Sequence, residues 1–189
     1  MNSGKNTLNP KLWIKTYADQ LFRFASIRIN DKETAKDLVQ ETFLSALKNV
    51  DTFKGEISEK NWLYMILKNK IIDHYRKKST SLISQFETST NINEYFDEES
   101  HWFQNKVPKE WQIDYNSTFD SNEFLEILQQ CMKRLSELLN IVFSMKYLDE
   151  KETDEICKEL KITTSNYWVI LHRSKLQLRD CIEKKWFIK

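Results

Sequence analysis

Glycine and proline are scarce in this sequence of 189 residues, which contains two of each. Folds built from many β-turns need these residues at the turns, so an all-β architecture is excluded. No apolar run approaches the roughly 18 residues of a membrane span. The first nine residues are polar and contain no apolar signal core. We therefore expect a cytoplasmic protein that is not inserted in a membrane.

Motifs for catalysis and metal binding are also missing. The sequence contains no glycine-rich phosphate loop, no HExxH motif and no nucleophile elbow, and its three histidines lie in different segments. Cys131, Cys157 and Cys181 are far apart and include no CxxC pair, which is typical of a reducing compartment. We therefore expect no enzymatic activity, no metal site and no cofactor.

The formal net charge is only +1, but the charges are unevenly distributed. Residues 1–80 carry a net charge of +6, residues 81–130 a net charge of −8, and residues 131–189 a net charge of +3. Two basic segments therefore flank an acidic one. Basic segments at both ends are compatible with two surfaces that bind nucleic acid.

Apolar residues recur every three to four positions along most of the chain, which predicts an all-α fold. The predicted helices span 11–29, 32–50, about 60–78, 123–139, about 140–148, 154–160 and 164–184. Residues 79–122 show no sustained period. We predict two small helical domains, 1–78 and 123–189, joined by a long acidic linker over 79–122.

The two last helices have the spacing of a helix-turn-helix, with Lys161-Ile-Thr163 as the turn. The residues expected in its core are Ile156, Leu160, Ile162, Tyr167 and Leu171. The residues expected to face DNA are Thr164, Ser165, Trp168, His172, Arg173 and Lys175. An α-helical hairpin with a solvated face would have the same spacing.

The end of the 60–78 helix is basic, and Trp62, Tyr64 and Tyr75 are interspersed along that helix. Cations and aromatic rings together are typical of surfaces that bind single-stranded nucleic acid. A core tryptophan beside a solvated basic end is the alternative interpretation.

Several segments resemble one known family. Asp37-Leu-Val-Gln-Glu-Thr-Phe-Leu-Ser-Ala-Leu47 is similar to the polymerase-binding helix of sigma factors. Phe53-Lys-Gly-Glu56, Trp62-Leu-Tyr64 and Asn69-x-x-x-Asp73-His-Tyr-Arg-Lys77 resemble the promoter-melting segment that follows it. Asp154-Glu-Ile-Cys-Lys-Glu-Leu160 and Trp168-Val-Ile-Leu-His-Arg173 resemble the reader of the upstream promoter element. Together they resemble the extracytoplasmic-function (ECF) group of bacterial RNA polymerase sigma factors.

This resemblance implies binding to core RNA polymerase, recognition of the −35 and −10 promoter elements, and assistance in DNA opening. It assigns polymerase binding to Asp37, Gln40, Glu41, Phe43 and Leu44. It assigns the downstream element to Phe53, Lys54, Gly55, Asn69, Arg76 and Lys77. It assigns the upstream element to the six residues of the 164–184 helix that are expected to face DNA. It also implies an anti-sigma factor as a partner. Trp168 and Ile170 depart from the family, in which Lys or Arg is common there.

Two alternatives to a sigma factor remain for the chain, and two roles remain for its linker. A helix-turn-helix repressor or activator would bind duplex DNA without polymerase, and a helical adaptor would bind only protein. The acidic linker would be either an RNA mimic, which occupies the polymerase cleft, or a solubilising tether.

Overall fold

The structure, a computed structural model, describes residues 7–88, 101, 103–104, 107 and 121–187. All regular structure in these residues is helical, which confirms the predicted fold class. The elements are η1 (Pro10–Leu12), α1 (Trp13–Arg28), α2 (Lys32–Lys48), η2 (Val50–Thr52), α3 (Glu59–Thr88), α4 (Ser121–Met132), α5 (Glu137–Tyr147), α6 (Thr153–Leu160), α7 (Thr164–Ile182) and η4 (Glu183–Phe187). Within the described part of the chain, no helix has both the length and the apolar character that crossing a membrane requires.

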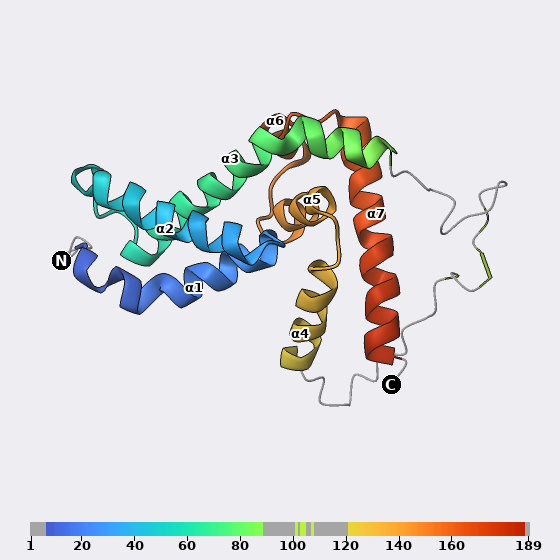
Figure 1. Ribbon diagram of the computed structural model, residues 1–189, viewed down its shortest axis with the longest axis horizontal. Coiled ribbons are helices and arrows are strands. Elements are labelled where there is room, and N and C mark those ends of the chain that lie inside the picture. Colours follow the sequence, from blue (N-terminus) through green and yellow to red (C-terminus); the bar gives the residue numbers. More distant parts are fainter. Residues whose placement is uncertain (1–6, 89–100, 102, 105–106, 108–120, 188–189) are drawn as a thin grey trace.

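The first three helices pack together as one bundle (Figure 1). Trp13 fills its core, and the neighbouring Leu12 is half exposed. The indole N–H of Trp13 donates to the Glu59 carboxylate at the start of α3, and the Tyr17 hydroxyl donates to the same carboxylate over 3.0 Å. This carboxylate therefore fastens the start of α1 to the start of α3.

The helix α3 is longer than the sequence predicted. It continues to Thr88, so residues 79–88, which we assigned to the linker, are helical. Leu82, Ile83 and Phe86 on this extension are partly buried against the core, and this packing offsets the low helix propensity of the surrounding serines and threonine. Most of the remaining predicted linker, including Asp97, Glu98 and Glu99, lies outside the described residues.

In the second group of helices, α4, α5 and α6 pack against α7, and α4 runs alongside it (Figure 1). The predicted 123–139 helix is in fact interrupted, because α4 ends at Met132 and α5 begins at Glu137. Ser136 has extended backbone dihedrals (φ −60°, ψ 158°) and precedes the first turn of α5. Leu135 and Leu138, on either side of the start of α5, are both in the core. Because their spacing is that of a continuous helix, the sequence did not reveal the break.

The cysteines also differ from expectation. Cys131 and Cys181 form a disulfide between α4 and α7, with their Cα atoms 5.7 Å apart, and Cys157 remains free. The expectation of a fully reduced chain is therefore wrong for this pair. Their separation of 50 positions in the sequence hid their proximity.

The two groups of helices contact each other through buried polar groups. Arg28 at the end of α1 forms an ion pair of 2.8 Å with Asp149, and their side chains are only 5% and 6% exposed. The fully buried Asn140 on α5 donates to the Ile27 carbonyl over 3.0 Å and to the Asn30 side chain over 3.1 Å. Because the partners are 110 to 121 residues apart, these bonds fix a specific arrangement of the two groups.

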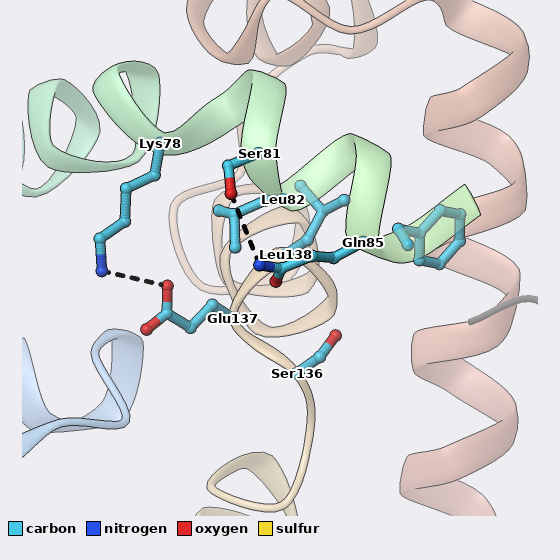
Figure 2. Close-up of a pocket in the computed structure, with 8 residues that line it drawn as sticks. Lys78, Ser81, Leu82, Gln85, Ser136, Glu137 and Leu138 are labelled. Carbon is cyan, nitrogen blue, oxygen red and sulfur yellow. Dashed lines mark hydrogen bonds and ion pairs between the residues drawn. The ribbon is translucent and has the colours of Figure 1, made fainter. Parts of the chain in front are cut away.

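The extension of α3 lies over the start of α5, where it borders a cleft of about 610 Å³. Figure 2 shows Lys78 reaching from α3 toward Glu137, with 3.5 Å between the charged atoms. Leu82 and Leu138 contribute apolar surface to the same cleft. The first and second helical groups therefore contact each other along α3 as well as at α1.

Candidate polymerase and nucleic-acid interfaces

The outer face of α2 carries four of the five residues assigned to polymerase binding. Asp37, Gln40, Glu41 and Leu44 are exposed and share one helical stripe, opposite the buried face of the same helix. The side chains on that buried face are Ala35, Leu38, Val39, Thr42, Phe43 and Ala46. Spacings of three and four residues place side chains on the same face, so the stripe is a continuous surface.

Phe43 does not belong to this surface. Its side chain is only 9% exposed and lies in the core, so an apolar contact of Phe43 with a partner does not fit the structure. Leu44, by contrast, is 58% exposed, and Leu47 one turn later is 50% exposed. Leu47 is not among the residues assigned to polymerase binding, although its spacing from Leu44 and Gln40 indicates the same face.

Glu41 has an intramolecular partner. Its carboxylate pairs with the Lys70 ammonium group of α3 over 3.1 Å, and the carboxylate remains more than half exposed. An exposed pair of this kind contributes about 1 kcal/mol or less. Glu41 can therefore exchange this contact for another at little cost.

The loop before α3 positions Phe53, Lys54 and Gly55. The Phe53 ring packs on Trp62 with 5.2 Å between centroids, and Trp62 in turn packs edge-on against Trp13 at 6.2 Å. Gly55 has φ 74°, a left-handed value that strongly favours glycine. Lys54 is exposed, so an aromatic cluster holds the loop while its cation faces solvent.

Asn69, Arg76 and Lys77 are exposed on α3. At about 1.5 Å per residue, Asn69 lies about 10 Å and Arg76 about 21 Å along the axis from Trp62, the residue that contacts the loop. Arg76 also donates to the Glu159 carbonyl of α6 over 3.2 Å and pairs with Asp73 at 3.0 Å. Asn69 is therefore close enough to share a site with the loop, whereas Arg76 lies against the second helical group.

The helices α6 and α7 form the predicted helix-turn-helix. The five residues expected in its core are all buried: Ile156, Leu160, Ile162, Tyr167 and Leu171. Lys161 ends α6 in the left-handed region, at φ 55° and ψ 42°. The Thr163 side chain accepts from the Asn166 N–H at 3.2 Å and caps α7.

Five of the six residues assigned to the upstream element are exposed on α7: Thr164, Ser165, Trp168, His172 and Lys175. Arg173 differs from them, because its guanidinium lies 4.6 Å from the centroid of the Phe86 ring. Arg173 is partly buried, and this burial lowers the pKa of its guanidinium. Val169, which is not among the residues assigned to the upstream element, is also exposed.

The part of the chain that the structure describes holds no group of three or more His, Cys, Asp or Glu side chains that could bind a metal ion. Burial raises the pKa of the free thiol of Cys157 on α6, and a hydrogen bond with Thr164 at the start of α7 opposes this rise. The arrangement is thus that of a helical DNA-binding protein in which a helix-turn-helix domain is joined to a second basic helical domain.

Comparison with known proteins extends this assignment. Residues 13–80 match Sigma-70 region 2, and residues 125–178 match Sigma-70 region 4. The chain is 39% identical to a "Probable RNA polymerase sigma factor" of Haemophilus influenzae, over 88% of this chain and 86% of the relative. It is 26% identical to "ECF RNA polymerase sigma factor SigX" of Bacillus subtilis, over 92% and 83%. It is 24% identical to "RNA polymerase sigma factor YlaC" of the same organism, over 90% of each chain.

The chain belongs to the ECF group of bacterial RNA polymerase sigma factors. Both promoter-recognition regions of the family are present and occur in the predicted order. The region 2 match ends within α3, eight residues before the end of that helix.

Proposed function

We propose that the exposed stripe of α2 is the surface by which this sigma factor binds core RNA polymerase. The observation that carries the proposal is the exposure of Asp37, Gln40, Glu41 and Leu44 on one face that the core does not use. Carboxylates around an exposed leucine give a surface with an apolar centre and an anionic rim. Such a surface suits a basic partner with an apolar contact point.

The loop before α3 and the adjoining face of α3 bind the downstream promoter element in this proposal. The aromatic packing of Phe53 on Trp62 supports it, because a base taken out of the DNA stack needs a preformed pocket. Lys54, Gly55 and Asn69 lie close enough to contribute to that pocket. Lys77 is further along α3 and contacts the DNA backbone. Arg76 joins it after exchanging its bond to the Glu159 carbonyl of α6.

The helix α7 reads the upstream element from the major groove. Its exposed residues Thr164, Ser165 and His172 supply donors and acceptors for base edges, while Lys175 supplies a cation for phosphate. Arg173 joins this surface after it leaves the Phe86 ring.

The remaining parts of the proposal follow from this role. The polymerase performs RNA synthesis, so the chain needs no catalytic site of its own and acts in the cytoplasm. The functional units are the domains 1–78 and 123–189, with the segment between them as a connection. An anti-sigma factor controls the chain by covering the α2 stripe.

Promoter-specific transcription with purified core polymerase tests the proposal. Core polymerase with the full chain should initiate at a subset of sequences in a random promoter library, and core alone should not. The variant Asp37→Arg should lose core binding, because like charges at an interface cost on the order of several kcal/mol.

The variant Glu126→Arg makes a matched change of charge on the exposed side of α4 and should bind core as the wild type does. Asp37→Arg avoids the Lys70 ion pair that a change of Glu41 would break. A folded Asp37→Arg chain with wild-type affinity for core would reject the α2 stripe as the binding surface.

A further inference from the structure

The exposed face of α7 has an unusual chemical composition for a helix that meets DNA. Its exposed side chains in the first three turns are Thr164, Ser165, Trp168, Val169 and His172. At 100° per residue they lie within an arc of about 140°. None of the five is a lysine, arginine, aspartate or glutamate, and the first cation along this face is Lys175.

Trp168 and Val169 form an apolar pair at the centre of this face. Trp168 is 56% exposed and Val169 is 42% exposed, so the core does not account for either side chain. The Trp168 ring packs edge-on against the fully buried Tyr167, with 5.1 Å between centroids. Tyr167 therefore holds the Trp168 indole in one position, although more than half of Trp168 is exposed to solvent.

Exposed lysines precede and follow the apolar pair along the chain. Lys158 on α6 and Lys161 in the turn come before it, and Lys175 comes about two turns after Trp168 on α7. An apolar centre with flanking cations matches the major groove, where phosphates line the edges and base edges form the floor. A protein partner for the same face would require carboxylates opposite three lysines.

We infer that Trp168 and Val169 read the C5-methyl groups of thymines in the upstream promoter element. Thymine is the base that presents a methyl group in the major groove, and apolar side chains recognise it by contact. The N-terminal part of a recognition helix is the part that approaches base edges. This inference rests on the proposed role of α7 and specifies the base chemistry that α7 selects.

Replacement of thymine by uracil tests the inference, because uracil pairs in the same way but lacks the methyl group. Holoenzyme made from core polymerase and the full chain would first select an upstream sequence from a random duplex library. Each thymine of that sequence would then be replaced by uracil in turn. Loss of one contacted methyl should weaken binding about four-fold, as expected for one buried methyl-sized group.

The variants identify the side chains that read the methyl. Trp168→Ala and Val169→Ala should each bring the thymine-to-uracil affinity ratio close to one at a different position. Val169→Thr keeps the shape but replaces a methyl with a hydroxyl, and it should lower the ratio at the same position as Val169→Ala. Leu125→Ala removes a half-exposed apolar side chain on α4 and should leave all ratios unchanged.

Salt separates this contact from phosphate binding. Affinity for both duplexes should fall between about 50 and about 200 mM salt, because counterions are released on phosphate binding. The ratio of the two affinities should stay constant, since a methyl contact releases no counterions.

Three results would overturn the inference. Equal affinity for thymine and uracil duplexes at every position would exclude methyl reading. The proposed function would still stand in that case, because the holoenzyme would have selected an upstream sequence. Unchanged ratios in both alanine variants, combined with loss of core binding, would show that the pair docks on protein. Failure of the holoenzyme to select any upstream sequence would remove the proposed function and the inference together.

Discussion

The guanidinium of Arg173 on α7 lies over the Phe86 ring of α3, 4.6 Å from its centroid. These residues are 87 positions apart in the chain. One is an expected reader of the upstream element, and the other is on the extension that continues beyond the region 2 match. In this arrangement Arg173 is engaged within the chain and must leave the ring before it can reach DNA.

Removal of the Phe86 ring should therefore strengthen upstream binding. A partly exposed cation–π contact is worth about 0.5–1 kcal/mol, so Phe86→Ala should tighten binding of the free chain to a selected duplex by about two- to five-fold. Fluorescence anisotropy measures this change. Gln85→Ala, a change at the neighbouring exposed residue, should have no effect, and equal affinity for both variants would show that the contact does not restrain Arg173.

Loss of Arg28 should separate the two helical groups. Removal of one partner from a buried ion pair costs about 3–5 kcal/mol when the other charge is left uncompensated. The Lys68 ammonium group lies 3.3 Å from the Asp149 carboxylate and compensates part of that charge, so the cost here should be lower. We expect Arg28→Met to increase the radius of gyration in small-angle scattering. The double variant Arg28→Met with Asp149→Leu should restore part of the compact form.

The pair of Lys36 and Glu33 provides the control for this experiment. Both of its side chains are more than half exposed, with 2.7 Å between the charged atoms, so solvent screens the pair and Lys36→Gln should leave the chain compact. If Arg28→Met stays as compact as Lys36→Gln, the buried pair does not hold the groups together.

The sequence predicted features that depend on neighbouring residues, and it did not predict contacts between residues that are far apart in the chain. The face of α2 followed from periodicity, because an amphipathic helix records in its own spacing which side is buried. The pairing of Arg28 with Asp149 crosses 121 residues and leaves no local pattern. The end of α3 was missed for a related reason, since Leu82 and Phe86 find their packing partners on other helices.

His74 should make stability depend on pH. Burial is the largest cause that lowers the pKa of His74 below 6.5, Lys78 and Lys77 lower it further, and Glu137 and Glu41 oppose them. The unfolded chain therefore binds this proton at a higher pH than the folded chain. As the pH falls below about 6.5, the free energy of unfolding should decrease.

Urea unfolding at about pH 7.5 and about pH 5.5 measures this dependence. The difference between the two values should shrink in His74→Gln and remain in His172→Gln, because His172 is exposed. An unchanged difference in His74→Gln would assign the pH dependence to other groups.

Lys161 is a site where glycine should stabilise the protein. A residue with a Cβ atom costs about 1–2 kcal/mol in the left-handed region, and glycine avoids this cost but has more freedom when unfolded. Lys161→Gly should therefore raise the free energy of unfolding by about 1 kcal/mol, and Lys161→Val should lower it. Lys158→Gly, within α6, should lower it by about 1 kcal/mol, so the same sign for both glycine variants would contradict the explanation.

The disulfide between Cys131 and Cys181 changes the covalent topology of the chain. It closes a ring that contains all of α5 and α6 and all of α7 except Ile182. A single break of the backbone within this ring, for example by a protease in the turn at Lys161, would leave both fragments covalently joined. Oxidised and reduced chains therefore differ in whether the DNA-reading unit can be separated by one cut, although their sequences are identical.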